Sequence, residues 1–216
     1  SLTAQDEKVR HFFDTWASKE KDYYLIVGRF VPENNYEIII HEFMKSQTQR
    51  DLLIVCNHQG SAYFEELRQK TNFDQDERIK FVGTIYDQDL LKYIRNQAFA
   101  YIHGHEVGGT NPGLLEALAQ TDLNLVLDVD FNRQVAKGTA FYWQKADASL
   151  VELIDQVDMK ADFNNNFHGK MPFGFIGGIG YRFKVSDKVA FFIEGEYLNI
   201  NVPRKESKLK DFSATR

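Results

Sequence analysis

The sequence predicts an α/β fold, in which a doubly wound sheet of parallel strands is followed by an antiparallel β-hairpin. The sheet is indicated by short apolar runs that alternate, from residue 23 to residue 157, with segments whose apolar residues recur at helical spacing. The hairpin is indicated by a change after residue 173, where glycines and aromatic residues become frequent and apolar residues recur with period two. The chain therefore divides into one sizeable core and a smaller appendage.

The elements of the first unit follow one another in a regular order. Residues 1–22 are expected to form an N-terminal helical segment. Apolar runs predict strands at residues 23–27, 52–56, 79–82, 99–102 and 123–127. Helical spacing predicts helices at residues 32–46, 63–70, 88–96 and 149–157, and a further helix that opens within residues 108–119. Strands and helices in this alternation are typical of a Rossmann-like doubly wound sheet over residues 23–157.

The second part of the chain has a different character. Three consecutive asparagines at residues 164–166 and Pro172 predict a linker over residues 158–172. Two strands are expected beyond it, at residues 175–185 and 189–202, within a hairpin over residues 173–202 that turns at residues 186–188. Residues 203–216 are charged and poor in apolar residues, which predicts a mobile tail.

Composition excludes several classes of protein. The formal net charge is -5 and the basic residues are dispersed, so the sequence shows no basic stripe for a nucleic-acid partner. The single cysteine, Cys56, lies in an apolar run, which predicts a buried small side chain in a reducing compartment. No apolar stretch approaches the roughly 20 residues of a membrane-spanning helix. These features predict a soluble, cytoplasmic first domain.

The strongest local feature is the segment of residues 103–116, HGHEVGGTNPGLLE, which leaves a strand, passes through paired glycines and opens a helix. Asn111 is expected to cap that helix, with Pro112 as its first residue. Unpaired N–H groups and the helix dipole would then face an anion, naturally a diphosphate, bound above Gly108, Gly109 and Thr110. A tight strand-to-helix turn without a ligand explains the glycines equally well.

Arg29 is the preferred cation for this anion. It follows Gly28 directly after the first strand, where an open α/β sheet presents its loops to a ligand. A guanidinium at this position can bind phosphate oxygens in bidentate fashion. The alternative is a surface arginine paired with Glu33.

Two carboxylates and two histidines are further candidates. Glu116 is one turn inside the helix, where it can accept hydrogen bonds from a ribose, and its alternative role is that of a solvated surface residue. Glu106 is placed to contact the hydroxyls of a sugar, or is an ordinary loop acid. His103 and His105 have a spacing found in metal sites, but no further cluster completes one, so no metal is expected. One of the histidines is instead expected to hydrogen-bond a phosphate or a sugar hydroxyl.

Three motifs in this order resemble a known family. They are YYLIVGRFVPENN from Tyr23, IKFVGT from Ile79, and the glycine-rich turn that ends in LLEAL. Together they resemble the C-terminal domain of family 4 GT-B glycosyltransferases over about residues 20–157. Within that family, HGHEVGGTNP is similar to the variant found in bacterial rhamnosyltransferases that build capsule and cell-wall polysaccharides.

The resemblance implies a donor site for a nucleoside-diphosphate sugar, specifically dTDP-rhamnose, with no other cofactor. It implies that Arg29 and the turn amides bind the diphosphate and that Glu116 binds the ribose. The backbone from Thr84 to Tyr86 is expected to face the base. Glu106 and His105 are the catalytic candidates. The acceptor is expected to be a saccharide or a lipid-linked saccharide, and the location cytoplasmic, including the inner face of a bacterial membrane.

The sequence departs from the family pattern at two places in the site. Most relatives have two glutamates separated by seven residues, but here Gly108 stands at the first of these positions and Glu106 lies upstream. Relatives also carry a lysine shortly after the arginine, where this chain has Asn34 and Asn35. One cation for the diphosphate is therefore missing from the sequence pattern.

A larger departure concerns the acceptor. GT-B enzymes bind it in an N-terminal Rossmann-like domain, and only about twenty residues precede the first strand here. Catalysis requires both reactants in one place. The chain by itself is therefore expected to bind donor nucleotide weakly and to transfer little or no sugar.

The hairpin allows more than one interpretation. It resembles a hairpin of a bacterial outer-membrane β-barrel, but two strands cannot close a barrel. A soluble hairpin packed on the α/β unit and an artificial or misassembled junction near residues 158–172 are the alternatives. A different function is also open, that of a noncatalytic interaction or membrane-associated module whose hairpin recruits a partner.

Overall fold

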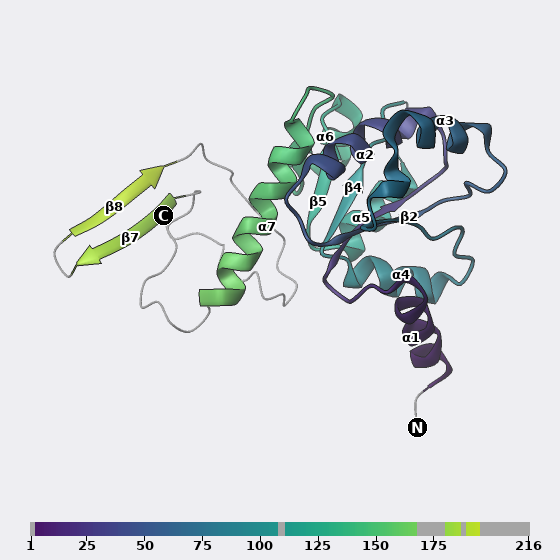
Figure 1. Ribbon diagram of the computed structural model, residues 1–216, viewed down its shortest axis with the longest axis horizontal. Coiled ribbons are helices and arrows are strands. Elements are labelled where there is room, and N and C mark those ends of the chain that lie inside the picture. The colour runs from purple at the N-terminus through teal and green to yellow at the C-terminus, as the bar shows by residue number, and fades with distance from the viewer. Residues whose placement is uncertain (1–2, 108–110, 168–179, 187–188, 195–216) are drawn as a thin grey trace.

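The computed structural model describes residues 3–107, 111–167, 180–186 and 189–194, with side-chain surroundings described as far as residue 162. Six parallel strands form the central sheet in the order β3-β2-β1-β4-β5-β6 (Figure 1). Their bounds are β1 (Tyr23–Val27), β2 (Asp51–Val55), β3 (Ile79–Phe81), β4 (Ala100–His103), β5 (Asn124–Leu127) and β6 (Phe141–Trp143). The predicted doubly wound α/β fold is confirmed.

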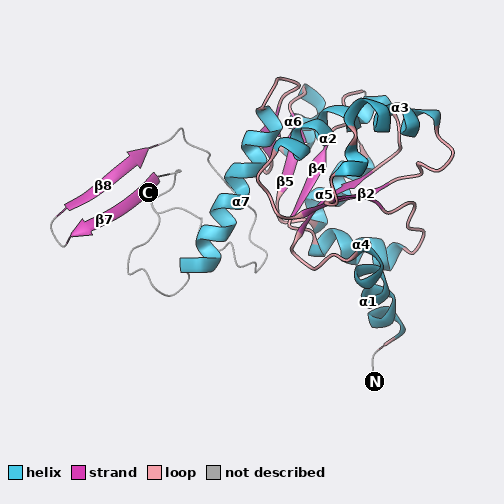
Figure 2. Cartoon of the chain, viewed as in Figure 1, coloured by secondary structure: helices cyan, strands magenta, loops and turns pink. Residues whose placement is uncertain are grey.

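Alternate residues of the strands bury themselves in two separate cores, because successive side chains of a strand point to opposite faces. Tyr24 and Ile26 belong to a core formed with α2 (Tyr36–Lys45), α3 (Ala62–Thr71) and α7 (Ser149–Phe167). Tyr23 and Leu25 belong to a core formed with α1 (Ala4–Trp16), α4 (Gln88–Gln97) and α5 (Pro112–Gln120). Helices thus cover both faces of the sheet (Figure 2).

Two elements at the edge of the sheet were not predicted. They are α6 (Asp130–Ala136) and β6, which pairs Phe141 with Leu125 of β5. A helix of 7 residues and a strand of 3 residues are too short to show a clear period. Strand β6 forms by pairing with β5 at the edge of the sheet.

The predicted helix at residues 32–46 begins later than expected. A short 3-10 helix, η1 (Pro32–Asn34), comes first, and α2 starts only at Tyr36. Asn35 separates the two with a left-handed backbone, at φ 57°, which interrupts the α-helical hydrogen-bond pattern. This break places the Asn34 and Asn35 side chains beside the loop that follows β4.

Helix α7 runs past the predicted end at residue 157. Residues 158–167 are helical, where the sequence predicted the start of a linker, and residues 168–172 lie outside the described residues. Asp158 is buried, accepts a hydrogen bond from the Tyr24 hydroxyl at 2.6 Å and pairs with Arg50 at 3.0 Å. These contacts tie the middle of the helix to the sheet.

The hairpin forms a sheet of its own. It consists of β7 (Gly180–Ser186) and β8 (Val189–Glu194), which pair antiparallel. The predicted strands were longer, but residues 175–179, 187–188 and 195–202 lie outside the described part of the chain, as does the predicted tail at residues 203–216.

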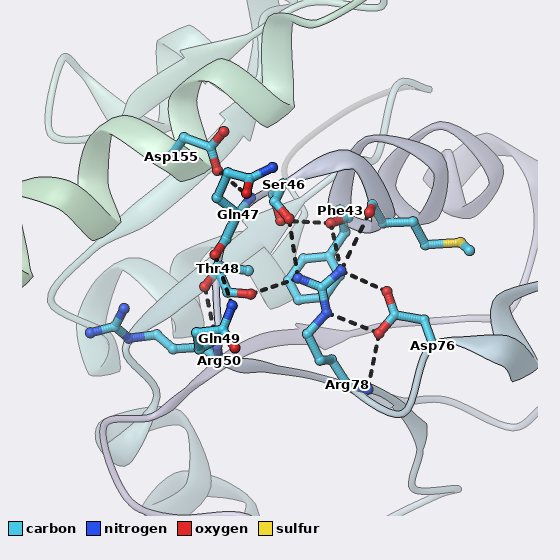
Figure 3. A network of polar contacts seen from close by, with 10 residues as sticks. Phe43, Ser46, Gln47, Thr48, Gln49, Arg50, Asp76, Arg78 and Asp155 are labelled. Carbon is cyan, nitrogen blue, oxygen red and sulfur yellow. Dashed lines mark hydrogen bonds and ion pairs between the residues drawn. The ribbon is translucent and has the colours of Figure 1, made fainter.

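A polar network fixes the end of α2 and the loop that enters β2 (Figure 3). The Arg78 guanidinium donates to the backbone oxygens of Ser46 at 3.2 Å and Thr48 at 2.6 Å, and lies 5.0 Å from the centre of the Phe43 ring. The Asp76 carboxylate accepts from it at 2.6 and 2.9 Å. Hydrogen bonding to Arg78 holds the pKa of Asp76 below its ordinary value. Arg78 therefore satisfies backbone oxygens that the helix leaves unpaired at its C-terminus.

Candidate functional site

A cavity of about 530 Å³ lies between β1 and β4. The order of the strands reverses there, because β2 and β3 are added on one side of β1 and β4, β5 and β6 on the other. Strands β1 and β4 are neighbours there, and the loops at their carboxyl ends leave toward opposite faces. Open α/β sheets bind ligands at such switch points. The lining residues come from β1, β4, the loops that follow them, α4 and the start of α5: Ile26, Val27, Gly28, Arg29, Asn34, Tyr36, Arg95, Tyr101, Ile102, His103, Gly104, His105, Asn111, Pro112 and Gly113. None of these lining residues is an Asp or a Glu.

Arg29 lines the cavity and is exposed. Its backbone oxygen accepts hydrogen bonds from Asn34 Nδ2 at 2.6 Å and from the Tyr36 hydroxyl at 3.1 Å, which fix the loop after β1. No ion pair joins its guanidinium to Glu33 or to another carboxylate in the described parts of the chain. The side chain is therefore available to an anion in the cavity.

The loop after β4 packs closely against the loop after β1. A Cβ atom at Gly104 would lie 2.3 Å from the backbone oxygen of Asn34, so only glycine permits this approach. The Asn35 side chain donates to the Gly104 oxygen at 2.7 Å, and the Glu106 amide donates to the Glu33 oxygen at 3.1 Å. The two loops thus form one wall of the cavity.

Both histidines of the motif line the cavity. His103 is 5% exposed, and its Nε2 has no hydrogen-bond partner among the described residues. Burial, and secondarily the proximity of His105, lowers the pKa of His103 to about 4, so the ring is neutral near pH 7. The Nδ1 atom of His105 lies 2.7 Å from Asn34 Oδ1.

The start of α5 has the predicted cap and first residue, and the Gly113, Leu114 and Leu115 amides all donate to Asn111. The Asn111 side chain caps the helix by accepting from the Gly113 amide at 2.9 Å, and Pro112 is the first helical residue. All three residues line the cavity, so the positive end of the helix dipole faces it. The glycine-rich residues Gly108, Gly109 and Thr110 lie outside the described residues.

Arg95 is a cavity residue that the sequence did not reveal. It is 5% exposed, and its Nη2 atom lies 2.7 Å from Glu116 Oε2, while its Nε has no partner among the described residues. Its position carried one signal, because Arg95 lies on the face of α4 that also buries Leu91 and Ile94. A charge on the buried face of an amphipathic helix points to a partner or a ligand.

Four predicted site residues do not line the cavity: Thr84, Tyr86, Glu106 and Glu116. Tyr86 is 85% exposed, and half of the Glu116 side chain is exposed beyond its contact with Arg95. Glu106 forms an ion pair at 2.6 Å with Lys145, which follows β6 and was not expected at the site. Hydrogen bonding to Lys145 holds the pKa of Glu106 below its ordinary value, so this residue is ionised at neutral pH. The roles of these residues stay predictions.

Helix α6 contacts the loop that carries His105. The side chain of Asn132 is fully buried and donates to the backbone oxygens of His105 and Leu127, both at 3.0 Å. The unpredicted edge of the sheet therefore holds the histidine loop.

No group of three or more His, Cys, Asp or Glu side chains in the residues that the structure describes is arranged to hold a metal ion. No described helix combines the length and the apolar character needed to cross a bilayer.

Comparison with solved structures links this fold to sugar-transferring enzymes, although neither a protein-family model nor a curated protein sequence matches the chain. A glycosyltransferase from Rickettsia africae superposes with a TM-score of 0.58 at 16% identity, over 74% of this chain and 43% of that one. HepE from Anabaena in complex with UDP gives a TM-score of 0.60 at 15% identity, over 74% of this chain and 44% of that one. The catalytic domain of a cholesterol-α-glucosyltransferase from Helicobacter pylori gives 0.51 at 17% identity, over 69% of this chain and 94% of that one.

These likenesses establish the fold. The chain spans less than half the length of the first two structures and 94% of the third, a catalytic domain. The Rickettsia protein is a glycosyltransferase and the Helicobacter protein a glucosyltransferase, the enzyme class that the sequence resemblance implied.

Proposed function

We propose that this chain is the donor-binding part of a glycosyltransferase and holds a nucleoside-diphosphate sugar in the cavity between β1, β4 and α5. The observation that carries the proposal is the charge of that cavity. Two guanidiniums, from Arg29 and Arg95, and the N-terminus of α5 converge on it, and none of the described residues that line it carries a carboxylate. Guanidiniums and helix N-termini are the groups that bind phosphate oxygens in proteins.

Arg95 supplies the cation that the sequence pattern lacks. The lysine of related sequences is replaced by Asn34 and Asn35, whose side chains bond to backbone oxygens and to His105. Arg95 reaches the same cavity from α4, and the Glu116 carboxylate orients its guanidinium. A second guanidinium, paired with Glu116, thus lines the cavity from another wall.

The sugar and the nucleotide are proposed from two different sources. The resemblance of HGHEVGGTNP to rhamnosyltransferases favours dTDP-rhamnose as donor and a polysaccharide or glycolipid as acceptor. One neighbour of this fold was solved with UDP-glucose, so UDP-sugars belong in any test. Transfer itself is proposed for this chain joined to an acceptor-binding domain, because catalysis requires both reactants in one place.

Isothermal titration calorimetry with dTDP, UDP, dTDP-rhamnose and UDP-glucose tests the proposal. We expect saturable binding of at least one of them. Arg29→Ala and Arg95→Met should each weaken it about 10- to 100-fold, because each removes charge-assisted hydrogen bonds. Arg68→Ala is the matched control, since this arginine lies on α3 and pairs with Glu65 outside the cavity. The proposal is wrong if no nucleotide binds, or if folded Arg29 and Arg95 variants bind as the parent does.

A further inference from the structure

Asn34 joins the two loops of the cavity wall through both ends of its amide. Its Nδ2 atom lies 2.6 Å from the backbone oxygen of Arg29, and its Oδ1 atom lies 2.7 Å from Nδ1 of His105. A carbonyl oxygen only accepts hydrogen bonds, so the amide must turn its NH₂ group toward Arg29 and its oxygen toward His105. The Nδ1 atom of His105 must then carry a proton in order to donate to that oxygen.

A neutral imidazole has a single N–H, so this bond also decides the state of the other ring nitrogen. With the proton on Nδ1, the Nε2 atom of His105 keeps a lone pair. His105 lines the cavity. Its ring also packs edge to face with the ring of Phe131, and the two ring centroids are 6.2 Å apart. Asn132 holds the His105 backbone oxygen at 3.0 Å. The residue is therefore held at both its ring and its main chain.

We propose that Asn34 is a positioning residue that fixes His105 in the Nδ1–H tautomer, so that Nε2 accepts a hydrogen bond from a hydroxyl group of the donor sugar. This inference rests on the proposed function, since it concerns the same cavity. It assigns His105 to the sugar and not to the diphosphate. Phosphate oxygens only accept hydrogen bonds, so a lone pair cannot bind them, whereas a hydroxyl can donate.

The opposite tautomer would reverse this preference. An Nε2–H group would donate to a phosphate oxygen and would leave the sugar without this contact. The Asn34 amide thereby makes His105 a residue that distinguishes a nucleotide sugar from the bare nucleoside diphosphate. The sequence left both partners open for the histidines, and the hydrogen bonds around Asn34 select one.

Nitrogen-15 NMR of the 216-residue chain reads the tautomer directly. Long-range proton–nitrogen correlations are recorded at alkaline pH, where the rings are neutral, and His105 is assigned by the signals lost in His105→Gln. We expect the Nδ1–H form in the parent protein and in Asn34→Asp, which keeps the acceptor oxygen. Asn34→Ala should shift His105 toward the Nε2–H form. Asn96→Ala, an exposed position on α4, serves as the matched control and should leave the signals unchanged.

Calorimetry then tests the consequence for binding. Asn34→Ala should weaken the nucleotide sugar about five- to tenfold, the worth of one hydrogen bond, and leave the matching nucleoside diphosphate nearly unaffected. A parent protein with His105 in the Nε2–H form overturns the inference without touching the proposed function, as does an equal loss for both ligands in folded Asn34→Ala. Absence of nucleotide binding with His105 in the Nδ1–H form overturns the proposed function instead, and with it the role of the lone pair.

Discussion

Two residues that line the cavity, His103 and Arg95, each bury a polar atom that has no hydrogen-bond partner among the described residues. These atoms are His103 Nε2 and Arg95 Nε. An unsatisfied buried polar atom costs about 1–3 kcal/mol. Native proteins retain few such groups, and each one calls for an explanation. A polar ligand in the cavity could supply partners to these two atoms, but seven other buried side-chain atoms of the described residues also lack a partner and belong to residues outside the cavity lining.

The burial of His103 predicts a dependence of stability on pH. The pKa of His103 is about 4 in the folded chain and about 6.5 when the chain is unfolded, so only the unfolded state takes up the proton between these values. The free energy of unfolding should therefore fall as the pH drops from about 6.5 to about 4. The loss attributable to His103 should be about 2 kcal/mol at about pH 5. Urea unfolding followed by circular dichroism at about pH 7.5 and about pH 5 measures it.

His103→Gln removes the titrating ring and should reduce this pH dependence. The same substitution at His11, an exposed residue of α1, is the control and should leave the dependence as in the parent. If His103→Gln loses as much stability on acidification as the parent does, other groups cause the effect and the neutral buried imidazole is refuted.

Among the elements, α2 shows how a tertiary contact ends a helix. The C-terminal oxygens of a helix need partners from outside it. Here Arg78, which precedes β3, provides them, and Asp76 fixes the guanidinium (Figure 3). One side chain, that of Arg78, thus holds the end of α2 and the segments that lead into β2 and β3. These segments lie where the amino ends of the strands meet.

Arg78→Met should destabilise the protein by about 3 kcal/mol, because it leaves backbone oxygens and the partly buried carboxylate of Asp76 without their donor. Arg78→Lys should recover only part of the loss, since an ammonium cannot reach several acceptors as a planar guanidinium does. Urea denaturation gives both values. Arg68→Met, on the exposed side of α3, should change stability by no more than about 0.5 kcal/mol. Equal effects of the Arg68 and Arg78 substitutions would refute the capping role.

On the scale of the whole molecule, the buried residues of both described hydrophobic clusters lie between Phe12 and Val157. Among the described strands, β7 and β8 share no hydrogen-bonded ladder with the central sheet. The last residues of the larger cluster, Leu153, Ile154 and Val157, come from α7. Nucleotide binding should therefore reside in the part of the chain that ends with this helix.

A chain shortened to residues 1–167 should unfold cooperatively near the melting temperature of the parent and bind nucleotide with the same Kd. Circular dichroism and calorimetry measure the two quantities. This experiment also separates the proposed function from a noncatalytic module in which the hairpin recruits a partner. Loss of nucleotide binding in a folded shortened chain would contradict the donor-site proposal and favour the hairpin.

The predicted and observed sites differ because some of the residues in contact at the site are far apart in the sequence. Arg29 and Asn111 could be placed from local patterns, namely a strand followed by a loop and a capped helix. Arg95 gave only one local signal, its place on the apolar face of α4, and that signal names neither the cavity nor Glu116. Lys145 gave none, because a charged residue in a loop does not show which carboxylate it faces. Asn34 was noted only as a missing lysine, and its bond to His105 spans 71 positions.

The sequence by itself determined the parallel sheet of this protein and the capped start of α5, because apolar periodicity and helix capping are local patterns. The tertiary structure alone decided the strand order, the sixth strand, the second guanidinium and the orientation of His105. These depend on backbone pairing and on hydrogen bonds between residues far apart in the chain, and no local pattern encodes such partners.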